Sequence, residues 1–161
     1  MITTDKIFYK NIPYQVSWIK SDDLSSLSPI KQIYALVIDS NTNILICREN
    51  PSAKWQLPGG KPELGENIKQ TIDRELLEEV DVTIRDLINL GYNEVVNSET
   101  NEKYYQLRFI ARLDELLDQT PDPDKKFIWE RKFIPLSEIK EYIKWGNSGN
   151  AMFDDAINLL K

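Results

Sequence analysis

Short apolar runs, rich in β-branched residues and bounded by turn-forming residues, recur along this chain. This pattern predicts strands, and it occurs at residues 6–9, 14–19, 33–38, 43–47, 83–96, 103–113 and 125–134. The first two runs are separated only by residues 11–13, and the next two only by residues 39–42. Both short connections contain Asn, Asp, Ser or Pro, so each pair of runs predicts a β-hairpin.

The segment from Pro58 to Gly65 is predicted to be a shaped loop without regular structure, because Gly and Pro interrupt it repeatedly. A helix is predicted directly after it. Asn67 can cap this helix together with Gln70 at the third helical position, and the apolar periodicity ends near Val80.

Two more helices are predicted near the C-terminus, over residues 137–145 and 150–160. Strands and helices therefore interleave, and the chain contains no repeat or low-complexity linker. This organisation predicts one domain over residues 1–161, of the α/β (α+β) class.

The composition limits the chemistry that the chain can perform. It has no histidine, which removes imidazole-based catalysis and imidazole metal sites. Its net charge of −6 disfavours binding to extended nucleic acid. The single cysteine, Cys47, lies in an apolar run and is expected to be a buried thiol. No apolar stretch approaches the length of a membrane span, and the first residues do not form a secretion signal, so we expect a cytoplasmic protein without membrane association.

The predicted helix before Val80 has one apolar and one acidic stripe. Ile72, Leu76 and Val80 recur every four residues, with Leu77 beside them, and should pack on the sheet. At about 100° of rotation per residue, three glutamates fall within one arc next to this stripe. They are Glu75, Glu78 and Glu79.

Three neighbouring carboxylates near a helix C-terminus repel one another and oppose the helix dipole. A divalent cation would compensate this cost, and an all-oxygen ligand set favours Mg²⁺, with Mn²⁺ as the alternative. A solvated acidic face without a metal remains the competing interpretation at this point.

The residues around this helix follow a longer pattern. Gly60, five residues, Glu66, seven residues, and then the run from Arg74 to Val82 resemble the Nudix box, G-x5-E-x7-R-E-U-x-E-E-x-G-U, in which U is apolar. Eight of its nine specified positions match. The departure is Asp81, where the family has glycine. Asp tolerates the left-handed conformation expected just after a helix better than most residues, so the change is interpreted as a structural substitution.

The resemblance implies an α/β/α sandwich around a mixed sheet and a small nucleotide-type substrate; it leaves a homodimer open. It implies that Glu75, Glu78 and Glu79, with the Gly60 carbonyl, bind the metal. The base that accepts a proton from water would be Glu78, Glu79 or an acid from a later segment. Glu130 is the candidate for that later acid, in competition with Glu94, Glu99 and Glu102.

Residues outside the carboxylate arc also receive roles from the resemblance. Arg48, which precedes the segment from Trp55 to Gly60, would meet substrate phosphate, or else be an exposed cation at a strand end. Trp55 itself is expected to pack. Arg74 and Glu66 would form an ion pair that holds the loop and the helix together, with Arg74 directed away from the carboxylate arc.

Three functions remain open from the sequence. The first is a nucleoside triphosphate pyrophosphohydrolase, which could remove damaged nucleotides. The second is a Nudix hydrolase of nucleotide sugars or dinucleoside polyphosphates. The third is a non-catalytic Nudix-like module that senses nucleotides, against which the retention of every box glutamate counts.

Overall fold

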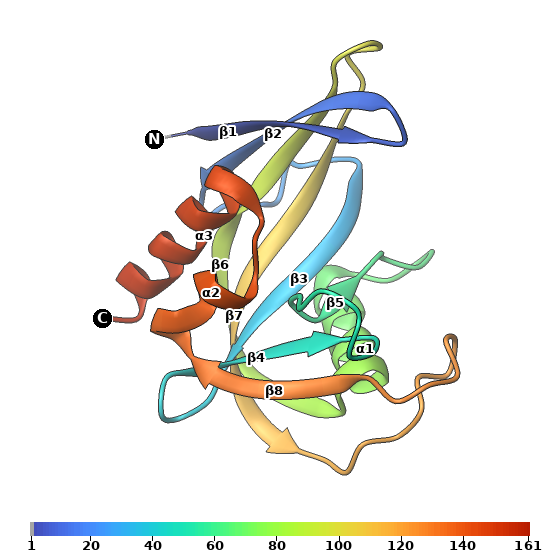
Figure 1. The fold of residues 1–161 in the computed structure, drawn as a ribbon, viewed down its shortest axis with the longest axis vertical. Coiled ribbons are helices and arrows are strands. Elements are labelled where there is room, and N and C mark those ends of the chain that lie inside the picture. The colour runs from blue at the N-terminus through green and yellow to red at the C-terminus, as the bar shows by residue number, and fades with distance from the viewer. Residues whose placement is uncertain (1) are drawn as a thin grey trace.

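An eight-stranded mixed sheet forms the centre of the protein in the computed structural model, which describes residues 2–161. The strand order is β1-β2-β6-β7-β3-β4-β8, and β5 pairs with β3 outside this path. The strands are β1 (Thr3–Tyr9), β2 (Ile12–Lys20), β3 (Ile30–Ile38), β4 (Asn43–Arg48), β5 (Gly59–Gly60), β6 (Val82–Asn97), β7 (Lys103–Leu116) and β8 (Glu130–Pro135). β3 and β7 run parallel, and the other paired strands run antiparallel (Figure 1).

One of the two predicted hairpins pairs along its whole length, and the other pairs only next to its turn. The first hairpin is confirmed, because β1 and β2 pair from Thr3↔Trp18 to Tyr9↔Ile12. The second has the predicted turn, but β3 and β4 pair only at Ile38↔Ile44. Beyond this point β4 pairs with β8, whereas β3 pairs with β7 and β5.

Helices cover both faces of the sheet. α1 (Ile68–Val80) lies on one face, and α2 (Ile139–Tyr142) and α3 (Gly146–Leu159) lie on the other (Figure 1). Alternate residues of β3 enter two separate buried clusters: Ala35 and Val37 contribute to the cluster with α1, and Leu36 and Ile38 to the cluster with α2 and α3. The predicted α/β/α sandwich is therefore confirmed. Among the helices of residues 2–161, none combines the length and the apolar character needed to span a bilayer.

The C-terminal helices begin and end at other residues than predicted. A 3-10 turn (Leu136–Glu138) leads into α2, which ends at Tyr142. α3 begins at Gly146, four residues before the predicted start at Asn150. A distant side chain explains the early start: the carboxylate of Asp5 in β1 accepts hydrogen bonds from the backbone N–H groups of Asn147 (3.2 Å) and Ser148 (2.6 Å). A cap supplied by another strand satisfies the free N–H groups at the start of the helix.

Candidate active site

The sequence encodes the start and the orientation of α1 locally. The Asn67 side chain accepts from Gln70 N at 2.8 Å, and the Gln70 side chain accepts from Asn67 N at 2.9 Å, which completes the predicted capping box. Ile72, Leu76 and Val80 are buried against the sheet as predicted. Leu77, which was also predicted to pack on the sheet, lies at the edge of the apolar stripe and is 43% exposed.

Two glycines bring the loop before α1 against its carboxylates. Gly59 N donates to Glu79 Oε1 at 2.8 Å, and a Cβ on Gly60 would lie 2.5 Å from Glu75 Oε1. The prediction that this segment has no regular structure is wrong at two residues: Gly59 and Gly60 form β5, which pairs with Tyr34 and Ile33 of β3, so the sheet fixes the position of the loop. A side chain at residue 60 would displace the carboxylate of Glu75 from this position.

The predicted ion pair of Arg74 and Glu66 is present. Arg74 Nε and Nη2 donate to the two oxygens of Glu66 at 2.7 and 3.0 Å, and Nη2 also donates to the Lys61 carbonyl at 3.1 Å. The expectation that Arg74 points away from the acidic arc is wrong, since its Nη1 contacts Glu75 at 2.9 Å and Glu78 at 3.3 Å. Its long side chain therefore connects the loop with two of the three glutamates.

Glu78 shares a group of three carboxylates with two acids that the sequence did not indicate, and within residues 2–161 neither Glu75 nor Glu79 belongs to this group. Carboxylate oxygens of Glu78, Asp122 and Asp124 lie within 4.8 Å of one another. Asp122 is buried, and it accepts from Trp129 Nε1 at 2.9 Å and from the backbone N–H of Asp124 at 2.9 Å. The alternation of Pro and Asp at residues 121–124 was the available signal, but the contact with Glu78 depends on the fold.

The loop that carries these acids is tied to the end of α1 by Asp81. Asp81 adopts the expected left-handed conformation, with φ 51° and ψ 50°. Its carboxylate accepts from Thr120 N at 3.1 Å and from Thr120 Oγ1 at 2.6 Å, and its carbonyl accepts from Leu117 N at 2.9 Å. The residue that departs from the family pattern therefore anchors the segment that leads to Asp122.

The structure places Glu130 and Arg48 beside each other at paired ends of β8 and β4, where the two side chains form an ion pair. The Arg48 guanidinium also lies over the Trp55 ring, 4.2 Å from its centroid. The ion pair with Glu130 and the Trp55 ring thus fix the position of the Arg48 side chain. The competing acids lie in the hairpin of β6 and β7; they are Glu94, Glu99 and Glu102.

Burial dominates the electrostatics of the glutamates on α1. Burial raises the pKa of Glu79 to about 8, against the opposing effect of the hydrogen bond from Gly59 N. Burial also raises the pKa values of Glu75 and Glu78, although Arg74 acts to lower both. In Asp122, burial acts to raise the pKa, but the hydrogen bonds from Trp129 and from backbone N–H groups lower it overall.

This donor set fits a hard divalent cation. Glu75, Glu78, Glu79, Asp122 and Asp124 supply oxygens only, and burial raises the pKa values of the three glutamates because it disfavours their ionised forms. An added cation would stabilise all of the ionised carboxylates, and oxygen ligands favour Mg²⁺ or Mn²⁺.

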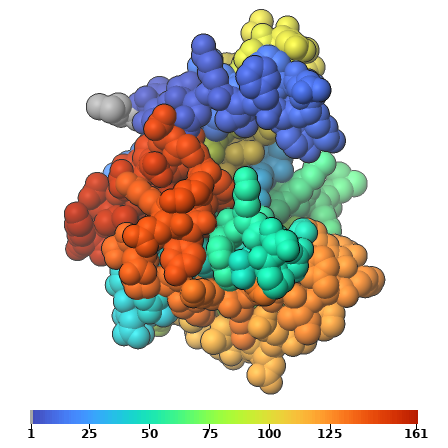
Figure 2. All heavy atoms as spheres, viewed as in Figure 1, coloured from blue at the N-terminus to red at the C-terminus, as the bar shows by residue number. Residues whose placement is uncertain are grey.

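The structure also contains a cavity of about 670 Å³, and none of these five acids lines it. It is bounded by the β1–β2 hairpin, the start of α3 and the loop before β5, and Figure 2 shows the hollow between these segments. Tyr34 lines the cavity and also pairs with Gly59, whose N–H donates to Glu79. Gly59 therefore connects a residue of the cavity lining with one glutamate of α1.

Comparison with known proteins identifies the class. The family model described as the NUDIX domain matches residues 29–154. This range covers most of the chain, and it includes the glycine loop, α1 and the acidic loop before β8. The chain belongs to the Nudix family, and it is a Nudix hydrolase. No curated protein matches it.

Solved structures share the fold at low sequence identity. A mutant of the pyrophosphohydrolase BsRppH from Bacillus subtilis superimposes with a TM-score of 0.72 at 20% identity, over 97% of this chain and 96% of that one. A NUDIX hydrolase from Nitrosomonas europaea gives 0.59 at 20% identity, over 80% and 88% of the chains. The MutT protein from Methanosarcina mazei gives 0.56 at 22% identity, over 84% and 99%.

Proposed function

We propose that this protein is a Mg²⁺-dependent pyrophosphohydrolase that splits the diphosphate linkage of a nucleoside-diphosphate-linked substrate, with a nucleoside triphosphate as the first candidate. Mn²⁺ is the alternative metal. One observation carries the proposal: residues 54–56 line a cavity large enough for a nucleotide, and residues 59 and 60 of the same segment lie against Glu79 and Glu75. A ligand in the cavity can therefore extend its phosphates to the carboxylate cluster.

The metal would be held by Glu75, Glu78, Glu79 and the Gly60 carbonyl, and Asp122 and Asp124 add oxygens on the side of Glu78. When bound, Mg²⁺ supplies charge neutralisation for the diphosphate and lowers the pKa of a coordinated water. The hydrogen bond from Gly59 N to Glu79 and the close approach of Gly60 to Glu75 support a role for this loop in positioning these two glutamates.

The chain's own residues would perform the remaining steps. Glu78 or Glu79 accepts the proton of the attacking water. Glu130 could accept it only by leaving Arg48, so we assign to Glu130 chiefly the positioning of that arginine. Arg48, fixed between Glu130 and Trp55, would bind a substrate phosphate. Arg74 and Glu66 maintain the geometry of the loop and α1.

The test is a panel of nucleoside triphosphates, nucleotide sugars and dinucleoside polyphosphates, assayed for phosphate and nucleotide products with Mg²⁺, with Mn²⁺ and with EDTA. We expect turnover of triphosphates with either metal and none with EDTA. Preferential turnover of a nucleotide sugar or a dinucleoside polyphosphate would favour the second function. Nucleotide binding without any turnover would reject the enzyme assignment in favour of a sensing module.

A further inference from the structure

The floor of the cavity is one face of the sheet, formed by neighbouring positions of three strands. Gln106 of β7 pairs with Asn93 of β6 and with Gln32 of β3, and Arg108 of β7 pairs with Tyr34 of β3. All five residues line the cavity. Residues that are directly opposite in adjacent strands project on the same side, so their side chains gather into one group.

Arg108 is the centre of this group. It is 2% exposed, it has no carboxylate partner among residues 2–161, and its guanidinium lies 4.8 Å from the centroid of the Tyr34 ring. Its nitrogens donate to Leu107 O at 3.1 Å, to Gln32 Oε1 at 2.9 Å and to Gln106 Oε1 at 3.2 Å. Nε has no partner within residues 2–161. A buried cation that only neutral groups contact is costly, and a ligand with an electron-rich acceptor would stabilise it.

Arg108 also orients the amides around it. Because a guanidinium can only donate, it requires the oxygens of Gln32 and Gln106 to face it. Gln106 Oε1 then accepts from Asn93 Nδ2 at 3.4 Å as well, which leaves Asn93 Oδ1 enclosed and without a partner in the described chain. The group thus presents a cation, the free amide nitrogens of two glutamines and one unpaired acceptor.

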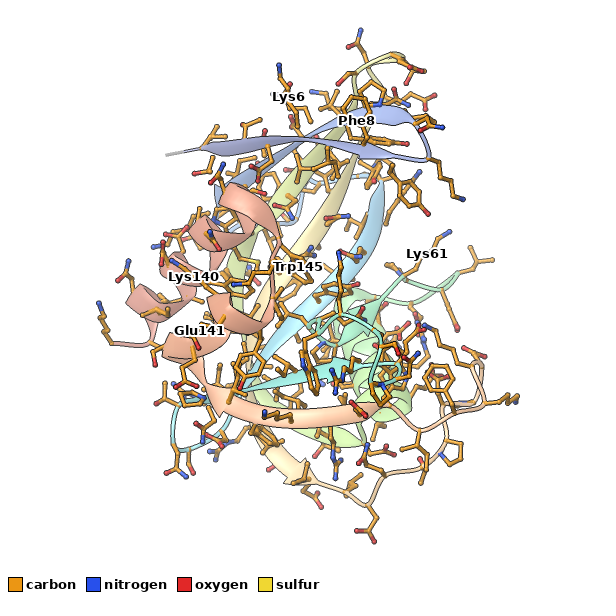
Figure 3. The ribbon with its side chains drawn as sticks, viewed as in Figure 1. Lys6, Phe8, Lys61, Lys140, Glu141 and Trp145 are labelled. Atoms are coloured by element: carbon orange, nitrogen blue, oxygen red, sulfur yellow. The ribbon has the colours of Figure 1, made fainter. Side chains whose placement is uncertain are left out.

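The walls of the cavity suit a nucleotide. Trp55 and Trp145 both line it, and Figure 3 shows Trp145 beside the start of α3, over the strands. Aromatic rings offer a stacking surface for a base. Lys6, Lys54 and Lys144 add exposed cations to the wall, although the chain as a whole carries a charge of −6. The one lining carboxylate, Asp5, is engaged by the start of α3.

We propose that this cavity binds the base of the nucleotide substrate, and that Arg108, Asn93 and the two glutamines select a 6-oxopurine, guanine or hypoxanthine, over adenine. A 6-oxopurine presents the O6 and N7 acceptors to the donors and the N1–H donor to Asn93 Oδ1. Adenine places an amino donor where O6 would be, and this donor would face the cation. The inference names the substrate class for the proposed function and rests on it.

Binding of nucleoside 5′-monophosphates to the full chain tests this selection by isothermal titration calorimetry. Monophosphates contain no diphosphate linkage, so their binding does not depend on turnover. The turnover assays with triphosphates test the hydrolase assignment independently. We expect inosine and guanosine monophosphates to have similar Kd values, and the adenosine and 2-aminopurine-riboside monophosphates to bind at least about tenfold more weakly. Equal Kd values for the inosine and adenosine forms, or no binding of any monophosphate at millimolar concentration, would overturn the proposal.

A matched pair of variants tests the assignment to the buried group. Asn93→Asp preserves side-chain shape and places a carboxylate next to Gln106, which binds Arg108, so the positive charge of the group is compensated within the protein. We expect the preference for inosine over adenosine monophosphate to fall towards unity. Asn97→Asp makes the same change on the same strand outside the cavity, and it should retain the preference. If folded Asn93→Asp retains the preference for inosine over adenosine monophosphate, this group does not select the base. If the variant does not fold, the Kd values of the unmodified protein for the two monophosphates still test the proposal.

Discussion

Replacing Asp81 with glycine restores the residue of the family pattern, and the structure predicts that this change destabilises the protein. Glycine would relieve the left-handed backbone, which favours the variant by about 1 kcal/mol. The variant would also lose both hydrogen bonds from Thr120 to the buried carboxylate. Bonds to a charged acceptor contribute roughly 1.5 kcal/mol each, and somewhat less here because Thr120 is exposed. The expected net loss is about 1–2 kcal/mol.

Thermal unfolding measured by circular dichroism in EDTA checks this estimate. For a chain of this size, a loss of 1 kcal/mol lowers Tm by about 2–4 °C, so the Asp81→Gly variant should melt roughly 5 °C below the parent. Asp81→Asn is the control, because Asn tolerates the left-handed conformation and can both accept from Thr120 N and donate to Thr120 Oγ1. A glycine variant that melts at or above the Tm of the parent would refute the anchoring role.

Three further results are expected. In EDTA the free energy of unfolding should fall as pH rises from about 4.5 to about 8, because the raised pKa of Glu79 means that the folded state holds a proton which the unfolded state releases. Urea titrations at several pH values should show that the free energy of unfolding falls less steeply with pH in Glu79→Gln than in the parent. The same dependence on pH in both proteins would contradict the burial argument. Arg74→Ala should lower both Tm and turnover, since five hydrogen bonds to the loop and the glutamates are lost, and a rise in KM alone would instead place Arg74 on the substrate. Gly60→Ala should weaken Mg²⁺ binding in a titration, because its Cβ would displace Glu75, and unchanged affinity would exclude residue 60 from the site.

Local interactions explain which parts of the structure could be predicted from the sequence. The capping box of Asn67 and Gln70, the apolar stripe of α1 and the left-handed Asp81 all depend on residues within a few positions of one another. These features follow from helix periodicity and capping, so they were predicted correctly.

Contacts between distant segments explain what could not be predicted. The start of α3 depends on Asp5, which lies 142 residues before Asn147. Asp122 lies 44 residues after Glu78 in the sequence, and no periodicity in the chain encodes their approach. The group around Arg108 likewise requires the register of three strands, so its members cannot be recognised as neighbours from their spacing.

The central claim is that the glutamates on α1 hold a catalytic metal, and the turnover of Glu79→Gln tests it most directly. This change preserves shape but removes one charge beside Gly59, whereas Asp73→Asn makes the same change at a side chain 42% exposed on the same helix. With excess Mg²⁺ and the best nucleoside triphosphate, we expect kcat to fall at least about a hundredfold in Glu79→Gln and to stay near the parent value in Asp73→Asn. A folded Glu79→Gln protein with the parent's kcat would contradict the account.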